Sequence, residues 1–405
     1  MVHNPTTLPS KYALPVKSTP KVRIITSLSL AVVLVSAFAW LGLGHVTGSI
    51  KRVDAFAGIK DRPVRASSAV NYLLVGSDTR EGLTKAELKA LRVGSTASAA
   101  GARSDTLLLI HISKARDKAV IISLPRDTLV TIPAHTSTVT GKPVAAMQSK
   151  LNAAYNYGGA PLLIQVIESK TNLRIDHYVE INFAGFAHVV DALGGIQVCS
   201  KVNINDPKSH LVLSAGVHTL DGIQALKYVR TRDFDGMGDL GRMQRQQQFM
   251  SSVLRKATST GVLLNPIKML NFFNAALATV KTDPGLNSSD LITLAKQMKN
   301  LSASKVRTLT VPLSNVNYVV PYVGSTVLWD PVLAPLLWQK LRDDLPIVDV
   351  VTPTPTPLTS TTKSTAKATA KSTAKAKVSA SATPTIIDKF KTRTASENPC
   401  ETLKY

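Results

Sequence analysis

Charged side chains flank three short apolar runs, each with the length and composition of a buried β-strand. The runs span 71–76, 106–113 and 119–125, and the charged residues at their ends are Asp78, Arg103, Asp105, Arg126 and Asp127. If the second and third runs pair as an antiparallel hairpin, Thr106 lies opposite Arg126 and the charged residues meet at one end of a sheet. Loops at strand ends commonly carry functional sites, although a structural ion-pair network would give the same pattern.

A second polar group follows later in the chain. Its members are Arg230, Arg232, Asp239, Arg242 and Gln246. The first two arginines are two residues apart, so an extended segment turns both toward the same side. The aspartate suits the N-cap of a helix expected over 240–257, and the third arginine and the glutamine share one face of that helix. The segment can therefore present these groups to one pocket; a solvated basic helix is the alternative.

These residue types suit a phosphorylated ligand. Guanidinium groups match pairs of phosphate oxygens, and paired aspartates supply the oxygen ligands that Mg²⁺ prefers. The sequence has no Walker loop, no dinucleotide-binding glycine fingerprint, no Cys/His spacing for zinc and no G-x-S-x-G element. The eight histidines are scattered, and His111, inside an apolar run, is interpreted as a core or edge residue.

Charge and composition narrow the class of protein. The 405 residues carry 48 lysines and arginines against 26 aspartates and glutamates, a formal net charge of +22, and 44% are hydrophobic. This apolar content excludes a wholly disordered chain, and two cysteines exclude a disulfide-dense scaffold and a four-cysteine zinc site. Residues 1–69 hold 9 basic and 2 acidic side chains and residues 351–405 hold 9 and 3, so much of the excess charge lies in the flanks. The charge indicates a polyanionic neighbourhood: nucleic acid, an anionic membrane surface or a phosphate-rich polymer.

The N-terminal part is divided by its composition. Residues 24–44 carry no charge, and at ~1.5 Å per residue they are long enough to cross one hydrocarbon core. We expect a cytoplasmic tail over 1–23, a retained transmembrane signal anchor over 24–44, a linker over 45–69, and the bulk of the chain outside the cytoplasm at the cell membrane. A cleaved signal peptide is the alternative, because residues 37–39 resemble a cleavage site.

The C-terminal part also differs from the middle of the chain. Residues 346–385 are rich in Thr, Pro, Ala and Lys and are expected to form a disordered, cationic linker. The tail over 386–405 contains Cys400, and the only other cysteine is Cys199. In an oxidising compartment a disulfide between them would fasten the tail to the core; two unrelated thiols are the alternative.

Residues 70–345 are expected to form a single domain. Strands are predicted for the three runs above and for 177–181 and 305–311, and helices for 161–171, 183–193, 221–229, 240–257, 262–280 and 289–300. Strands and helices are intermixed, which favours a mixed α/β (α+β) fold, with a central mixed sheet flanked by helices. The Ala/Ser-rich stretch 82–102 is expected to be a flexible rim over the site.

Six motifs, in this order, make the chain resemble the LytR-CpsA-Psr (LCP) family of cell-wall polymer transferases. They are NYLLVGSDTREG (71–82), ARSDTLLLIHI (102–112), IISLPRDTLVTIP (121–133), KLNAAYNYGG (150–159), HYVEINFAGFAHVVDALGGIQV (177–198) and GVHTLDGIQALKYVRTRDFDGMGDLGRMQRQQQF (216–249). A short cytoplasmic tail, one membrane span and an extracytoplasmic domain are also similar to that family, and TRTASENPC resembles some actinobacterial members. The resemblance implies one LCP-type catalytic domain.

That resemblance implies transfer of a glycan phosphate from a polyprenyl-pyrophosphate carrier to a peptidoglycan hydroxyl, with release of polyprenyl phosphate. The implied partners are the lipid-linked glycan, peptidoglycan and the cytoplasmic membrane, with no nucleic acid; teichoic acid, arabinogalactan and capsule-like polymers all stay open. By position, Asp78 and Asp105 would hold Mg²⁺. The groups implied to hold the phosphates and the head group are Arg103, Arg126, Lys150, Arg230, Arg232, Arg242 and Gln246, with Asp239 orienting the neighbouring arginines.

Two parts of this mechanism depend on residues that the sequence does not single out. A carboxylate near the acceptor would take its proton, and Asp78, Asp105 and Asp127 are the candidates. The polyprenyl chain needs an apolar groove, for which the helices expected over 161–171 and 183–193 and a third over 262–280 are candidates.

Two other functions are compatible with the same residues. A lipid-pyrophosphate hydrolase would use water as the acceptor. A non-enzymatic, lipid-binding or regulatory wall protein would not turn the ligand over. Binding of DNA is disfavoured, because the middle of the chain is only mildly basic, no helix-turn-helix pattern is evident, and the expected span places this domain outside the cytoplasm.

Overall fold

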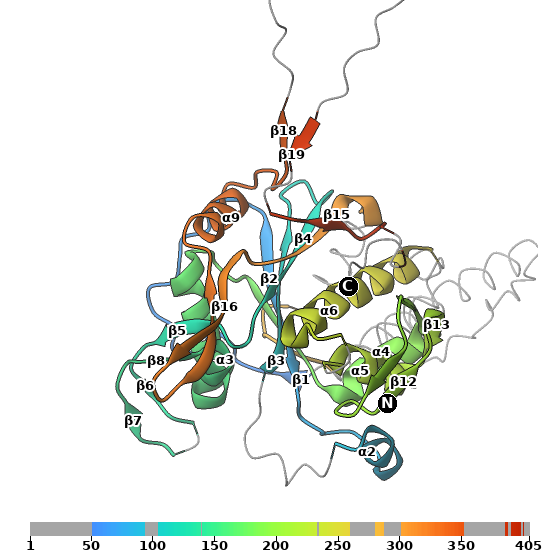
Figure 1. Cartoon of the computed structure of the whole chain (residues 1–405). Coiled ribbons are helices and arrows are strands. Elements are labelled where there is room, and N and C mark those ends of the chain that lie inside the picture. Colours follow the sequence, from blue (N-terminus) through green and yellow to red (C-terminus); the bar gives the residue numbers. More distant parts are fainter. Residues whose placement is uncertain are drawn as a thin grey trace, which may run out of the picture. The chain divides into compact units, whose positions relative to one another are not determined.

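The computed structural model describes residues 51–93, 104–138, 140–232, 235–259, 280–286, 301–351, 385–387, 390–397 and 400 (Figure 1). All of them belong to one unit, residues 50–405. The expected tail and anchor over 1–44 lie outside the described residues, as do 262–279, 289–300 and most of the expected linker over 346–385. In the described part of the chain no helix combines the length and apolar character needed to cross a membrane.

A mixed sheet forms the centre of the described chain, as the intermixed strand and helix patterns predict. Its strands, in spatial order, are β1 (Lys51–Arg52), β14 (Val280–Thr282), β9 (His177–Ile181), β2 (Val70–Ser77), β3 (Ser104–Ile112), β4 (Ala119–Leu124), β15 (Val306–Thr310) and β20 (Arg393–Thr394). The pairs β1/β14, β2/β9 and β4/β15 are parallel, and the other neighbours are antiparallel. The five strands expected from the sequence are β2, β3, β4, β9 and β15, all within two residues of the predicted bounds.

The hairpin of β3 and β4 differs from its prediction by one residue. Leu107 pairs with Leu124 and Ile112 with Ala119, so the expected pairing of Thr106 with Arg126 is wrong. The reason lies in the turn, because Ser113 N–H donates to the Lys118 carbonyl at 3.0 Å and leaves a loop of four residues rather than five. A second irregularity lies at the opposite end of β3, where a β-bulge at Asp105 shifts its register against β2. Bulges of this kind redirect side chains near functional sites.

Side chains alternate between the two faces of the sheet, and both faces are covered. Leu73 and Val75 of β2 pack with α3 (Leu151–Thr171) and α9 (Leu333–Arg342), while Tyr72 and Leu74 face α6 (Gly238–Ser259). Figure 1 shows α3 and α6 on opposite sides of the central strands. A third cluster of apolar side chains joins α6 to α4 (Phe183–Ala192), α5 (Gly222–Arg230) and α2 (Lys85–Leu91).

The helices begin and end at recognisable signals. Asn182 caps α4 by accepting from Gly185 N–H at 2.8 Å, and Asp221 caps α5 with Gln224 completing a capping box. Gly222 allows α5 to approach α4 closely, because a Cβ there would lie 2.3 Å from the Ala187 carbonyl oxygen. The helix expected over 161–171 is longer in the structure: α3 starts at Leu151 and is interrupted by a non-helical Gly159.

Several short elements complete the fold. They are β5 (Leu129–Ile132) with β8 (Met147–Lys150), β6 (His135–Thr136) with β7 (Pro143–Val144), β10 (Ile196–Ser200) with β13 (Gly216–Leu220), β11 (Ile204–Asp206) with β12 (Leu211–Leu213), β16 (Leu313–Val320) with β17 (Gly324–Trp329), β18 (Asp349–Val351) with β19 (Thr385–Ile387), and the 3₁₀ turn η3 (Ala303–Lys305). Helix α2 lies in the stretch expected to be a flexible rim. Its capping box, Thr84 with Glu87, supplies the local signal for that helix.

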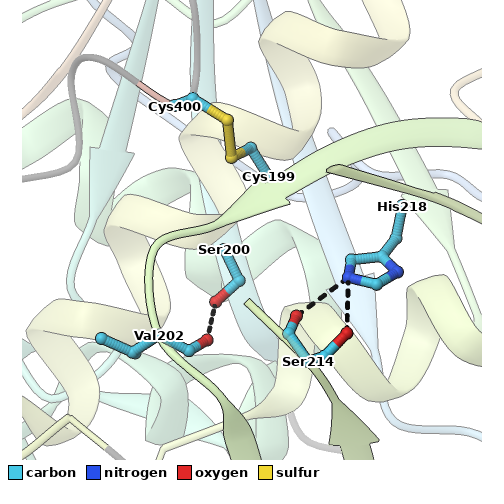
Figure 2. The surroundings of a disulfide bond; sticks show 6 residues. All are labelled: Cys199, Ser200, Val202, Ser214, His218 and Cys400. Atoms are coloured by element: carbon cyan, nitrogen blue, oxygen red, sulfur yellow. Dashed lines mark hydrogen bonds between the residues drawn. A yellow bond between two sulfur atoms is a disulfide. The ribbon is translucent and has the colours of Figure 1, made fainter. Parts of the chain in front are cut away.

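Both ends of the described chain pack more extensively than their composition suggests. The segment expected as a linker over 45–69 contributes β1 to the sheet and the fully buried Ala55 to the core. Within the tail over 386–405, β20 extends the sheet and Cys400 is joined to Cys199 of β10 by a disulfide, with the Cα atoms 5.4 Å apart (Figure 2). The structure therefore forms the bond that the two cysteines suggested.

Candidate active site

A cavity of about 500 Å³ lies between the sheet and helices α4, α5 and α6. Its polar end is lined by Ser77, Asp78, Arg126, Lys208, Arg230, Arg232, Arg242 and Gln246. Its apolar part is lined by side chains that include Leu74, Leu108, Phe183, Phe186, Val189, Val229, Phe249 and Met250. The described lining is thus amphipathic: it combines four arginines and a lysine with a larger set of apolar side chains.

Helix α6 supplies two polar groups of the lining, Arg242 and Gln246, and also Asp239, which contacts the first of them. Arg242 Nη2 lies 2.7 Å from Asp239 Oδ1, and Arg232 Nε lies 3.7 Å from the same oxygen. Gln246 Nε2 donates to Thr106 Oγ1 at 3.0 Å and to the Val229 carbonyl at 3.2 Å. Asp239 is in the first turn of α6 rather than at the N-cap position predicted for it, because the helix begins at Gly238, two residues earlier than predicted. A carboxylate there interacts favourably with the helix dipole.

Arg230, the last residue of α5, and Arg232, two residues further on, both line the cavity, and other residues hold this segment in place. The Arg230 guanidinium lies 4.9 Å from the centre of the Phe183 ring, and the Arg232 N–H donates to the buried Asp206 carboxylate. Between them, Thr231 is fully buried. The expectation that both arginines turn to the same side agrees with their shared place in the cavity lining.

Sequence reasoning missed the residues that brace this segment. Arg245 and Asp235, each with a side chain 1% exposed, form an ion pair, and Arg245 Nη2 also donates to the Thr231 carbonyl at 2.6 Å. Helix α6 is buried on most of its circumference around this position, so spacing alone did not separate Arg245 from the arginines that face the cavity. Asp206 was missed as well, although Asp followed by Pro is a turn signature; its carboxylate accepts from Lys208 N–H and Ser209 N–H at 2.8 Å.

A tight turn after β4 carries Arg126 and Asp127. Thr128 N–H donates to the Pro125 carbonyl at 3.0 Å and closes the turn. Arg126 lines the cavity, but Asp127 points elsewhere: its carboxylate lies 3.1 Å from Lys150 Nζ, and both line a second hollow of about 320 Å³. The structure therefore separates Asp127 and Lys150 from the other candidate residues and leaves Arg126 shared by the two spaces.

The two aspartates expected to hold a metal lie on neighbouring strands. Asp78 directly follows β2 and lines the cavity, whereas Asp105 lies at the bulge in β3. The Asp105 side chain and all of Arg103 fall outside what the structure describes. Within the described ranges, no group of three or more His, Cys, Asp and Glu side chains is placed to hold a metal ion. Carboxylate oxygen from Asp78 is the hard ligand that Mg²⁺ takes in proteins.

A buried carboxylate lies behind the end of β2. Glu180 accepts from the hydroxyls of Tyr155 at 2.8 Å and Tyr178 at 2.9 Å, and Lys281 Nζ lies 3.6 Å away. Burial, together with the neighbouring Glu180 charge, raises the pKa of both tyrosines. Both phenols therefore stay protonated and act as donors, which ties α3 to β9 beneath the site.

Of the helices expected to form an apolar groove, one lines the cavity. The helix predicted over 183–193 provides Phe183, Phe186 and Val189. The helix predicted over 161–171 packs into the core on the opposite face of the sheet instead, so it is not part of the groove. Most of the third candidate, 262–280, lies outside the described residues.

Comparison with known proteins gives consistent results. A model of the LytR_cpsA_psr family matches residues 47–329. The protein named "Probable cell wall biosynthesis protein LcpB" of Corynebacterium glutamicum is 35% identical over 293 residues, which cover 72% of this chain and 65% of LcpB. The chain thus spans somewhat less than two thirds of the length of that relative.

Two further similarities concern proteins named for teichoic acid. The polyisoprenyl-teichoic acid–peptidoglycan teichoic acid transferase TagU of Bacillus cereus is 31% identical over 258 residues, covering 64% of this chain and 74% of TagU. A solved structure titled "TagT bound to LI-WTA" superposes with a TM-score of 0.52 at 27% identity, covering 73% of this chain and 98% of that one.

Proposed function

This chain belongs to the LytR-CpsA-Psr family, and on that premise we propose that it transfers a glycan phosphate from a polyprenyl-pyrophosphate carrier to peptidoglycan. The reaction would attach a secondary cell-wall polymer and release polyprenyl phosphate. The observation that carries the proposal is the amphipathic cavity, because its arginines suit the pyrophosphate of a lipid carrier and its apolar side chains suit the polyprenyl chain. The names of TagU and of its relatives support this class of substrate.

The polar end of the cavity would bind the pyrophosphate. Arg126 lies in the turn after β4, Arg230 is the last residue of α5, Arg232 lies in the segment after α5, and Arg242 lies in α6. Guanidinium groups fixed around one space can pair with several phosphate oxygens without reorganising during the reaction. Since Asp239 contacts both Arg232 and Arg242, it would hold their side chains at a fixed separation. Phosphoryl transfer depends mainly on such positioning and charge neutralisation.

Magnesium fits the same end of the cavity. Mg²⁺ is commonly held by one or two carboxylates together with substrate phosphates, and Asp78 offers a carboxylate beside four arginines that attract phosphate. Asp105, on the neighbouring strand, would be the second carboxylate. When bound, the ion would supply additional neutralisation of the charge on the diphosphate.

The apolar part of the cavity would take the first isoprene units of the carrier. Phe183, Phe186 and Phe249 line it, and the rings of Phe186 and Phe249 lie 5.3 Å apart. We further propose that residues 1–23 lie in the cytoplasm and residues 24–44 anchor the chain in the membrane, so that the cavity faces the wall. The lipid carrier would then lie in the same membrane as the anchor.

The experiment that tests this function uses the full-length chain in detergent. It would be incubated with Mg²⁺ and a polyprenyl-pyrophosphate-linked sugar, with and without soluble peptidoglycan fragments, and lipid and sugar would be followed by mass spectrometry. We expect sugar phosphate on the fragments, lost in Arg232→Ala and retained in Lys118→Ala, an exposed lysine at the far end of the same hairpin that leads to Arg126. Equal loss in both variants, or unaltered transfer in Arg232→Ala, would contradict the proposal.

Water is the competing acceptor in that experiment. The second hollow beside Arg126 is lined by side chains that are only partly buried, so solvent has access to it. We therefore propose slow release of sugar phosphate to water when peptidoglycan is absent. Release that is not suppressed by adding fragments would identify a hydrolase instead of a transferase.

A further inference from the structure

The second hollow lies directly beside the cationic end of the cavity. It has a volume of about 320 Å³ and is lined by Arg126, Asp127, Lys150, Asn152, Ala153 and Asn156. Because Arg126 lines both spaces, a group bound in the hollow lies next to whatever occupies the polar end of the cavity. Small-molecule sites have volumes of about 300–1,000 Å³, so this hollow is large enough for a sugar ring but not for an extended lipid.

Three backbone hydrogen bonds, two from α3 and one from β17, hold the turn that forms one wall of this hollow. The N-terminus of α3 docks on the turn, with Asn152 N–H donating to the Arg126 carbonyl at 3.0 Å and Leu151 N–H to the Thr128 carbonyl at 2.9 Å. From β17, Val327 N–H donates to the Asp127 carbonyl at 2.9 Å. The turn is therefore held at both its helix side and its strand side, so Arg126 and Asp127 keep a constant separation.

The side chains of the hollow differ in chemistry from those of the cavity. Asp127 contacts Lys150 at 3.1 Å and Arg126 at 3.5 Å, so a carboxylate compensates much of the positive charge here. Asn152 and Asn156 are four residues apart and fall on the same face of α3. Carboxamides both donate and accept hydrogen bonds, which suits hydroxyl and acetamido groups of an uncharged sugar better than a phosphate.

We propose that this hollow is the acceptor site: it binds the hydroxyl-bearing amino sugar of peptidoglycan, and Asp127 accepts the proton of the attacking hydroxyl. The inference rests on the proposed transfer function. It assigns Asp127 as the proton acceptor, because among the candidate aspartates whose side chains the structure describes Asp127 lines the hollow and Asp78 lines the donor cavity. Lys150 acts as a positioning residue that orients the Asp127 carboxylate.

In the proposed step the acceptor oxygen forms a bond to the phosphorus that carries the glycan, and the bond from that phosphorus to the bridging oxygen of the carrier breaks. Polyprenyl phosphate leaves with the electron pair of that bond, and the hydroxyl proton passes to Asp127. Arg126, placed between the two spaces, contacts the phosphate that both oxygens share.

The test compares variants along α3 in the full-length chain. Asn156→Ala removes one carboxamide from the hollow, and Ser169→Ala removes an exposed hydroxyl near the other end of the same helix, where it lines none of the described pockets. We expect Asn156→Ala to raise the KM for soluble peptidoglycan fragments about tenfold, the usual consequence of losing a hydrogen bond to substrate, with the Kd for the lipid-linked sugar within twofold. Ser169→Ala should alter neither constant.

Two outcomes would overturn the inference. An unchanged KM for the fragments in Asn156→Ala would mean that the hollow does not hold the acceptor. A Kd for the lipid-linked sugar that rises as much as the KM for the fragments would assign the hollow to the donor. Both outcomes require that the wild-type chain transfers sugar phosphate. If the wild type transfers nothing, the proposed function is wrong. Direct titration of the same fragments onto the wild type and Asn156→Ala then still decides whether the hollow binds them.

Asp127 is tested separately by an isosteric change. Asp127→Asn keeps the shape of the side chain but cannot accept the proton, and general-base catalysis contributes roughly 10²–10⁴-fold to rate. We expect kcat for transfer to fall by at least 10² while the KM for the fragments changes less than threefold, and the acidic limb of the pH–rate profile to disappear. A fall in kcat that leaves the acidic limb intact would make Asp127 a positioning residue only.

Discussion

The two faces of the central sheet are built differently, although the same strands form both. On the face covered by α3 and α9, Leu73, Val75 and Leu109 are fully buried and the space between sheet and helices is filled. On the face covered by α4, α5 and α6, Leu74 is only partly buried and lines a cavity of about 500 Å³. We call these the closed face and the hollow face. Their difference shows that one face supplies most of the packing that stabilises the fold, which leaves the other free to hold a ligand.

The largest expected effect concerns activity on the hollow face. Arg242→Ala should lower kcat/KM for transfer by about 10³, equivalent to about 4 kcal/mol of transition-state stabilisation, because a fixed arginine beside a transferring phosphoryl group contributes on this scale. The unfolding midpoint should change little, since Asp239, the partner it leaves behind, is one-third exposed. Steady-state kinetics and thermal unfolding of the same preparation check both parts. Loss of activity accompanied by a large loss of stability would show that Arg242 belongs to the fold rather than to the site.

A matched pair on β2 compares the two faces directly. Leu73 and Leu74 are neighbours that point to opposite faces, the first fully buried and the second lining the cavity. Leu73→Ala should lower the free energy of unfolding by about 3 kcal/mol, as truncations in a filled core do. Leu74→Ala should cost about half of that, because its neighbourhood already contains a cavity, and it should weaken binding of the lipid-linked sugar. Denaturant unfolding measures the first effect and donor titration the second; equal destabilisation by the two variants would remove the distinction between the faces.

Removal of the Cys199–Cys400 disulfide measures how much this bond stabilises the attachment of the C-terminal tail. Cys199 lies in β10, and Cys400 follows a segment whose Ala395 and Glu397 carbonyls accept hydrogen bonds from Arg255 of α6. The double variant Cys199→Ser/Cys400→Ser should lower the free energy of unfolding by about 2 kcal/mol, toward the lower end of the effect of removing a disulfide, because these contacts still hold the tail. Urea unfolding of the wild type under oxidising and reducing conditions should show the same difference. A variant as stable as the oxidised wild type would show that the bond adds nothing to the packing of the tail.

Sequence reasoning predicted the strands and the helices of the hollow face better than the helices of the closed face. Helices α4, α5 and α6 begin and end within two residues of their predicted bounds, whereas α3 begins ten residues before its predicted start and α9 was not predicted. Strand and helix patterns depend on periodic burial, which is why β2, β3, β4, β9 and β15 were found within two residues of their ends. The motif residues Asp78, Arg126 and Arg232, which the sequence singled out by type and spacing, all line the cavity. The buried pair of Arg245 and Asp235 was not, since burial of a charged side chain depends on a partner ten residues away and not on local pattern.

The sequence also did not predict that Asp127 lies outside the cavity. The hairpin prediction placed Arg126 and Asp127 together at one end of the sheet, and the chain does place them in one turn. Successive side chains in a turn point in different directions, however, and only the contact with Lys150 at 3.1 Å shows which space Asp127 enters. Likewise, α3 begins as early as Leu151 because its first N–H groups donate hydrogen bonds to that turn. Helix propensity does not predict such a tertiary contact.

The smallest expected effect is a pH dependence that arises on the closed face. His111 is 4% exposed, and its ring nitrogens contact Asn71 Oδ1 at 2.8 Å and Asp344 Oδ1 at 3.2 Å. Burial lowers the pKa of His111 below its ordinary value, and the Asp344 carboxylate offsets part of that shift. The folded chain therefore favours the neutral ring, whereas the unfolded chain takes up a proton near pH ~6.5. As the pH falls through that value the unfolded state gains protons first, so stability present above about pH 7.5 is lost toward pH 5.

His111→Gln removes this contribution. Urea unfolding is compared at about pH 7.5 and about pH 5. The wild type should lose more stability than His111→Gln between these values, because at low pH its unfolded state binds a proton at His111 that the buried ring of the folded state does not favour. His188→Gln is the control, since His188 is 44% exposed and its Glu87 partner is 3.8 Å away, and this variant should lose as much stability as the wild type. If His111→Gln and the wild type lose the same stability between the two pH values, the pH dependence of unfolding does not arise from His111.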